Sequence, residues 1–196
     1  MIAAQPLVFA SHNAHKVQEI NAKLGTSMLV KGLHEIGCTE EIPETADTLE
    51  GNARIKAWHV YNQYGHNCFA DDTGLEVVAL NNAPGVRSAR YAGEHKSFED
   101  NMNLLLENMK HETNREARFR TVICLVLHGK EYVFDGVVNG HIAREKRGLR
   151  GFGYDPVFVP AVTSATFAEM DMDEKNLISH RAKAVQLLAE FLQINF

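Results

Sequence analysis

Short apolar runs alternate with segments of helical periodicity early in the chain, and this alternation constrains the fold more than any other feature. The pattern predicts strands at residues 7–10, 28–30 and 68–70, with helices at residues 17–24 and 48–64 between them. Gly25 is expected to end the first helix, and Asp71 and Asp72 to end the third strand. Strands that alternate with helices in this way are typical of α/β proteins, in which helices pack on a sheet.

The rest of the chain predicts more helix and a hairpin. Residues 98–109 form an amphipathic pattern, and residues 184–191 carry the pattern of a last helix. Residues 117–138 predict two strands with a turn at residues 128–130, and one more strand is expected at residues 157–159. We therefore expect a layered α/β fold with a mixed sheet. With no repeat and no flexible linker in 196 residues, one domain is expected.

Charge and apolar content exclude several classes of protein. The 20 basic and 25 acidic residues give a net charge of −5, which argues against a duplex nucleic acid partner. The longest apolar run, residues 122–127, is too short to span a membrane, and the apolar start lacks the basic region of a signal peptide. The cysteines form no CxxC pair, so we expect reduced, buried thiols in a cytoplasmic protein at Cys38, Cys68 and Cys124.

A polar segment between the first strand and the first helix is a candidate phosphate site. It consists of Ser11, His12, Asn13, Ala14, His15 and Lys16. A helix start presents unpaired N–H groups and partial positive charge, which favour a bound anion and disfavour a lysine. Lys16 is therefore interpreted as a phosphate ligand, with Ser11 and Asn13 as donors or caps. An asparagine cap followed by a solvated lysine is the alternative.

Adjacent acidic residues follow the third predicted strand. Because side chains alternate along a strand, we expect Asp71 and Asp72 to face opposite sides, one serving a site and the other bracing a loop or a helix end. Two acids that merely cap a turn are the alternative. Two carboxylates near phosphates make a typical Mg²⁺ site. The candidate acidic partners are Glu40, Glu41 and Glu44.

Two residues of a predicted helix and one loop are further candidates for the functional site. Asn52 and Lys56 lie four residues apart, so both can project toward one point, although a solvated lysine is the commoner case. The loop formed by residues 151–156 places aromatic residues between glycines, which suits stacking on a base. A turn that packs Phe152 into the core is the alternative.

The start of the last helix again carries cations where its dipole disfavours them, in Ser179, His180 and Arg181. Two such positions suggest helix ends that bind a ligand. Lys175, just upstream, could simply pair with its acidic neighbours. The remaining histidines, among them His34 and His59, show no zinc-ligand spacing with each other or with cysteine, and we assign them no chemistry.

Taken in order, these segments resemble the inosine/xanthosine triphosphate pyrophosphatase family, which removes non-standard purine nucleotides. The resemblance covers nearly the whole chain. It is carried by residues 9–16, 44–49, 52–53, 56–57, 70–75, 84–91, 151–156, 175 and 178–181. Family members often have glycine at His12, serine at Thr73 and glutamate at Gly51, so the chain departs from the pattern at these positions.

The resemblance implies one domain over residues 1–196, with two lobes around a central cleft and a long mixed sheet. It implies a cytoplasmic homodimer that uses Mg²⁺ to convert a purine nucleoside triphosphate such as ITP, dITP or XTP to its monophosphate and pyrophosphate. No nucleic acid or membrane partner is expected. Asp72 would accept the proton and, with Glu44 (or Glu41), hold the metal, while Lys56 would neutralise phosphate charge. Phosphate contacts would come from residues 11–16, with Thr73 also on the substrate. The base would be held by Phe152, Gly153, Tyr154, Asp155, Lys175, His180 and Arg181.

Recognition of a 6-oxo purine would use Arg181 or loop N–H groups as donors, because adenine offers an amino group there. Two rival functions remain. One is a pyrophosphatase for modified pyrimidine nucleotides, and the other is a non-catalytic purine nucleotide sensor, which Gly51 would favour.

Overall fold

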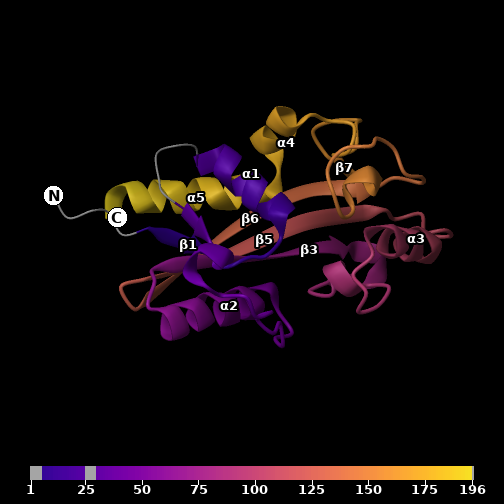
Figure 1. Ribbon diagram of the computed structural model, residues 1–196. Coiled ribbons are helices and arrows are strands. Elements are labelled where there is room, and N and C mark those ends of the chain that lie inside the picture. Colours follow the sequence, from indigo (N-terminus) through magenta and orange to yellow (C-terminus); the bar gives the residue numbers. More distant parts are fainter. Residues whose placement is uncertain (1–5, 25–29, 196) are drawn as a thin grey trace. The chain divides into compact units, whose positions relative to one another are not determined.

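The computed structural model describes residues 6–24 and 30–195 and has the expected α/β architecture (Figure 1). The helices are α1 (Ala14–Leu24), α2 (Leu49–Tyr64), α3 (Phe98–Asn108), α4 (Met172–Ile178) and α5 (His180–Asn195). The strands are β1 (Leu7–Phe9), β2 (Val30–Gly32), β3 (Cys68–Val77), β4 (Pro84–Gly85), β5 (Glu116–Leu127), β6 (Lys130–Ile142) and β7 (Phe158–Pro160). Among the described residues, no helix is long and apolar enough to cross a membrane.

The strands form one mixed sheet in the order β2-β1-β3-β5-β6-β7, with β4 paired to β3 outside this path. β1 is parallel to both β2 and β3, whereas β4 and β7 are antiparallel to β3 and β6. Phe9 pairs with Phe69 in this register, and their rings stack 4.9 Å apart. The predicted mixed sheet is confirmed.

The chain divides into two compact units, each described here by itself. Unit 1 comprises the described part of Met1–Asp72, Thr121–Gly136 and the described part of Arg181–Phe196. Unit 2 comprises Thr73–Arg120 and Val137–His180. Whether the two units surround a cleft stays a prediction from the resemblance.

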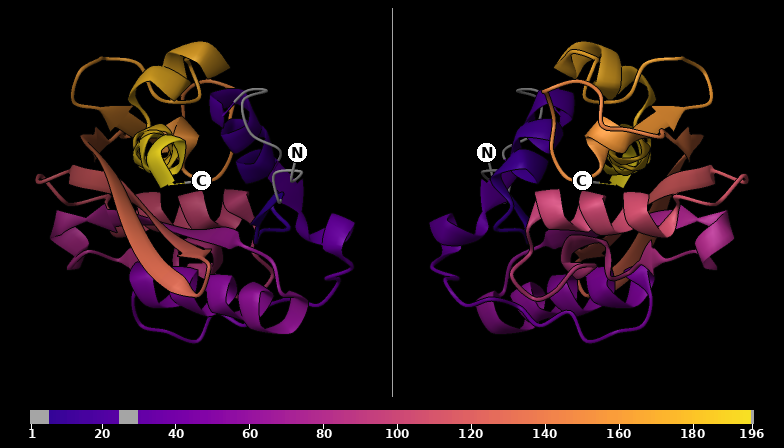
Figure 2. Two further views of the ribbon diagram at one scale, coloured as in Figure 1. Left: turned by 90° about the vertical axis from the view of Figure 1, so that its left-hand side faces the viewer. Right: turned by 90° about the vertical axis from the view of Figure 1, so that its right-hand side faces the viewer.

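The strands of unit 1 are apolar on both faces. Successive residues of each strand enter different clusters, because side chains alternate along a strand. One cluster joins Leu7, Phe9, Phe69, Ile123 and Leu125 to Ile20 of α1 and Leu188 of α5. The other joins Val8, Ala10, Cys68, Ala70, Cys124 and Val126 to Ala53, Ala57 and Val60 of α2. Helices α1 and α5 therefore cover one face and α2 the other (Figures 1 and 2).

Unit 2 has its own core around α3. Ser97 caps this helix by accepting a hydrogen bond from the Asp100 N–H. Met102, Leu105 and Met109 of the predicted apolar face are buried, whereas Phe98 at its start is exposed. Phe119 packs edge-on against Phe158, with ring centroids 4.7 Å apart. The core members include Met102, Leu105, Met109, Phe119, Tyr154, Phe158 and Phe167.

The third strand is longer than predicted. Asp71 and Asp72 were expected to end it, but β3 continues through them to Val77. Carboxylates are rare in strands, and the expectation was wrong because partners distant in sequence compensate these two. The expected strand at residues 28–30 begins at Val30 in the structure, while Met28, Leu29 and the predicted helix stop at Gly25 lie outside the described residues.

The predicted hairpin is confirmed, with a turn at His128 and Gly129. Both residues have positive φ values, 50° and 75°, as the tightest hairpin turns require. The last predicted strand is displaced by one residue, to Phe158–Pro160, because a 3-10 turn occupies Asp155–Val157. Cys38, Cys68 and Cys124 are all buried free thiols, as expected.

Replacing Leu105 by alanine should lower the free energy of unfolding by about 2–5 kcal/mol, because the side chain is completely buried in the core of unit 2. Leu149→Ala is the matched control in the same unit, since Leu149 is fully exposed, and it should change stability by less than about 0.5 kcal/mol. Urea unfolding followed by circular dichroism measures both. Equal losses in the two variants would contradict the assigned core.

Candidate functional site

The polar segment before α1 caps that helix. The Asn13 side-chain oxygen accepts hydrogen bonds from the N–H groups of His15 and Lys16, at 3.0 and 3.3 Å. Ser11 Oγ accepts from the Asn13 N–H at 3.2 Å. The expectation of a cap is confirmed for Asn13, while Ser11 holds Asn13 from outside the helix. Asn13 thus fixes the first turn, from which Lys16 projects.

Lys16 is not a solvated lysine. Its ammonium donates to Asp71 Oδ1 at 2.9 Å, and only 14% of its side chain is exposed. Burial lowers the pKa of Lys16, although Asp71 opposes that shift. The lysine is therefore held at one position by a carboxylate of β3.

Asp71 is the centre of a buried ion-pair network on the α1 and α5 face of the sheet. It accepts from Lys16 and from Arg181 Nε, at 2.9 and 3.3 Å, and Arg181 Nη1 donates to Glu19. Burial would raise the pKa of Asp71, but Lys16 and Arg181 hold it well below its usual value. One carboxylate of the pair thus braces the starts of α1 and α5, as the sequence predicted.

Asp72 faces the other side, toward α2. Asn52 Nδ2 donates to Asp72 Oδ2 at 3.1 Å, and Lys56 Nζ lies 3.9 Å from Asp72 Oδ1. The prediction that Asn52 and Lys56 project toward one point is confirmed. Burial raises the pKa of Asp72, although Lys56 and Lys16 act to lower it. A carboxylate with a raised pKa, fixed by an amide, has the properties of a general base.

Glu44 joins this group through Lys56, whose ammonium donates to Glu44 Oε1 at 2.5 Å. Glu44 and Asp72 therefore share one buried cation. Their donor atoms are all carboxylate oxygens, which Mg²⁺ prefers, so the residues present fit a hard divalent cation. With such an ion on the carboxylates, Lys56 would be available to phosphate oxygens.

The segment that carries Glu44 is attached to the start of α2. Asn52 Oδ1 accepts from the Ala46 N–H at 2.9 Å, and Thr48 Oγ1 accepts from the Gly51 N–H at 3.0 Å. A Cβ on Gly51 would lie 2.5 Å from the Ala46 Cβ. Gly51 therefore allows Ala46 to approach the start of α2 closely in this chain.

Unit 2 brings together three of the predicted base-binding residues. Asp155 Oδ2 accepts from the Phe152 N–H at 2.9 Å and from Lys175 Nζ at 2.8 Å. The Lys175 ammonium also lies 5.0 Å from the centroid of the Phe152 ring. The structure thus pairs Lys175 with Asp155, a partner distant in sequence, rather than with its acidic neighbours alone, and Phe152 is half-buried.

Two other predicted base-binding side chains lie in the core of unit 2. The Tyr154 hydroxyl donates to the Ser88 carbonyl at 2.9 Å, and its ring belongs to the apolar cluster. His180 stacks on Phe119, with centroids 4.5 Å apart and planes 13° from parallel. These contacts stabilise the loop that begins at Gly151 and the start of α5.

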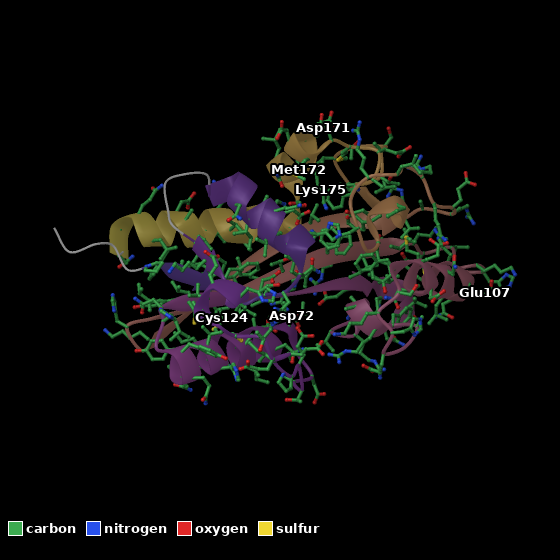
Figure 3. The ribbon with its side chains drawn as sticks, viewed as in Figure 1. Asp72, Glu107, Cys124, Asp171, Met172 and Lys175 are labelled. Atoms are coloured by element: carbon green, nitrogen blue, oxygen red, sulfur yellow. The ribbon has the colours of Figure 1, made fainter. Side chains whose placement is uncertain are left out.

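The predicted site residues are thus distributed over both units; Figure 3 labels one from each, Asp72 and Lys175. In unit 1 lie Ser11, His12, Asn13, Ala14, His15, Lys16, Glu44, Lys56, Asp72 and Arg181. In unit 2 lie Thr73, Phe152, Gly153, Tyr154, Asp155, Lys175 and His180.

Sequence reasoning missed Glu19. The sequence offers little indication of its ion pair with Arg181, because a glutamate three residues after Lys16 on a helix normally lies in solvent.

Comparisons with known proteins identify the family of this chain. A protein from Flavobacterium johnsoniae named dITP/XTP pyrophosphatase is 54% identical over 186 residues, which cover 95% of this chain and 97% of the relative. A protein of the same name from Porphyromonas gingivalis is also 54% identical, over 96% and 97% of the two chains. The solved Ham1 protein of Staphylococcus aureus has a TM-score of 0.90 and 38% identity, covering 98% of this chain and all of that one. The sequence model of the Ham1 family matches residues 7–191, and this chain belongs to the Ham1 family.

Proposed function

We propose that this chain hydrolyses non-standard purine nucleoside triphosphates to the monophosphate and pyrophosphate. The observation that carries the proposal is the 54% identity, over nearly the full length of both chains, to relatives named dITP/XTP pyrophosphatase. The residues around Asp71 and Asp72 supply the chemistry that such a reaction needs, because they combine two buried carboxylates with two lysines.

Asp72 is the proposed general base. Its carboxylate takes a proton from the attacking water, and Asn52 fixes its orientation through the hydrogen bond to Oδ2. Lys56, 3.9 Å away, stabilises the carboxylate form before the reaction. Burial keeps bulk water away from the group and strengthens these interactions.

Glu44 and Asp72 are the proposed ligands of Mg²⁺. When bound, this ion would offset charge on the phosphates and acidify a coordinated water. Two carboxylates, with the remaining positions left to water and phosphate, match the coordination that Mg²⁺ takes in proteins. The attachment of residue 46 to Asn52 holds the Glu44 segment near Asp72.

Lys16 and Lys56 are the proposed phosphate ligands, together with the segment from Ser11 to Lys16 at the start of α1. Asp71 positions Lys16 through the 2.9 Å ion pair, so the ammonium is oriented before substrate binds. The unpaired N–H groups of the first helical turn favour the same anion.

Phe152, Lys175 and the backbone of the loop from Gly153 to Asp155 are the proposed base contacts, in unit 2. The Phe152 ring offers a stacking face, and Lys175 beside it is a donor for a 6-oxo group. An adenine amino group would leave that donor unpaired. Thr73, His180 and Arg181 remain predicted substrate contacts, Arg181 despite its ion pairs to Glu19 and Asp71.

A homodimeric, cytoplasmic enzyme without nucleic acid or membrane partners is proposed on the family resemblance and the acidic composition. Neither property is needed for the chemistry described above.

Asp72→Asn should lower kcat by about 10²–10⁴-fold while nucleotide binding is kept, because the amide can still bond to Asn52 but cannot accept a proton. Pyrophosphate release measures turnover, and calorimetry with ITP measures binding. Asp47→Asn, an exposed acid of the neighbouring segment, is the control and should retain full activity. Near-normal turnover in the Asp72 variant would remove this residue from the mechanism.

Glu44→Gln should raise the Mg²⁺ concentration for half-maximal activity by at least about tenfold, since one charged ligand is lost. Glu41→Gln, three residues earlier and exposed, should leave that concentration unchanged. Titration of Mg²⁺ at a fixed ITP concentration measures both. The reverse result would assign the metal to Glu41.

A panel of nucleotides tests the function itself. ITP, dITP and XTP should be hydrolysed with kcat/KM values at least about 10²-fold above that of ATP, because a 6-amino group mismatches a buried donor. Preference for modified pyrimidine nucleotides would favour the first rival function. Tight purine binding without pyrophosphate release in Mg²⁺ would favour a sensor.

A further inference from the structure

A second group of metal-binding side chains lies in unit 1, between the segment that follows β2 and the outer part of α2. It consists of Cys38, Glu40 and His59, whose ligand atoms all lie within 4.8 Å of one another. Within it, His59 Nε2 is 3.0 Å from Glu40 Oε1. None of these residues belongs to the proposed phosphate and Mg²⁺ site.

The donor set selects the kind of ion. A thiolate, an imidazole and a carboxylate suit Zn²⁺, whereas Mg²⁺ takes oxygen ligands only. In a tetrahedral zinc site, bond lengths of about 2.0–2.3 Å place ligand atoms roughly 3.3–3.8 Å apart. The widest separation in the group therefore needs to contract by up to about 1.5 Å, which side-chain rotations can supply.

Surrounding contacts hold the ligands in place. The Tyr64 hydroxyl donates to both oxygens of Glu40, at 2.8 and 2.9 Å, in the manner of an outer hydrogen bond to a carboxylate ligand. The Cys38 N–H donates to the Leu33 carbonyl at 3.0 Å, which fixes the backbone that carries the thiol. Each ligand thus comes from a segment that is anchored without a metal.

Access to the group is open on one side. Cys38 is buried, His59 is half-buried and Glu40 is exposed. An ion can therefore enter past Glu40, and water can complete its coordination as a fourth ligand.

We propose that Cys38, Glu40 and His59 bind one Zn²⁺ ion. On binding, the Cys38 thiol releases its proton to solvent, and His59 exchanges its contact with Glu40 for a bond to the metal. The ion joins the segment from Cys38 to Glu40 to α2. Since Glu44 follows four residues later, the bound ion also restrains the segment that carries this proposed Mg²⁺ ligand.

The test is a titration of the full-length protein with Co²⁺, in excess Mg²⁺ so that the oxygen site is occupied. One equivalent of Co²⁺ should produce the near-ultraviolet charge-transfer band of a thiolate ligand, and one equivalent of Zn²⁺ should remove it. Zn²⁺ should also raise the melting temperature of the protein, since it binds only the folded state.

Variants assign the ligands. Cys38→Ser should abolish the band, and His59→Ala should weaken Co²⁺ binding by more than about 100-fold, because loss of even an outer contact costs 10–100-fold. Tyr64→Phe, which removes such an outer contact, should weaken binding by about tenfold. Cys124→Ala and His66→Ala are the matched controls, a buried thiol and a half-buried histidine outside the group, and should bind as the parent does.

Circular dichroism of each apo variant establishes that it is folded. The proposal is overturned if the parent shows no thiolate band, if the band survives in Cys38→Ser, or if it disappears in Cys124→Ala. It is also overturned if His59→Ala and His66→Ala bind Co²⁺ equally well. Because the readout is the metal spectrum, failure here leaves the proposed pyrophosphatase activity unaffected.

Discussion

Two adjacent carboxylates in the middle of a buried strand impose the main physical constraint on unit 1. Asp71 and Asp72 point to opposite faces of β3, and an unpaired charge at either position would destabilise the fold strongly. Each face therefore supplies its own compensation. Lys16 and Arg181 neutralise Asp71 from α1 and α5, while Lys56 and Asn52 stabilise Asp72 from α2.

The two faces of β3 compensate their carboxylates in different ways. The network of Asp71, Arg181 and Glu19 ties two helix starts to the sheet and is almost entirely buried. On the other face Lys56 is shared by Asp72 and Glu44, so an arriving cation or phosphate can exchange with existing charges. The side chains of the proposed site are therefore already oriented without a ligand, and such preorganisation favours catalysis by electrostatic stabilisation.

The segment between β2 and α2 carries residues of both proposed metal sites, and side chains of α2 contact it. This segment carries Cys38, Glu40 and Glu44, and α2 carries partners for the two glutamates: His59 and Tyr64 contact Glu40, and Lys56 contacts Glu44. Gly51 allows Ala46 to approach the start of the helix closely. The segment is therefore bound to one helix along its length, through side chains rather than regular backbone pairing.

Local sequence patterns were sufficient to predict much of the structure of this protein. Period-two alternation in the strands, helical spacing in α2 and α3, the hairpin turn at His128 and Gly129, and the opposite directions of Asp71 and Asp72 follow from backbone geometry alone. The length of β3, the ion pairs of Glu19 and Arg181, the burial of Tyr154 and His180, and the meeting of Cys38 with His59 did not follow from it. These features depend on which distant residue contacts a buried charge, ring or thiol. Such a contact stabilises the protein only after folding has brought the two residues together, so local sequence does not reveal it.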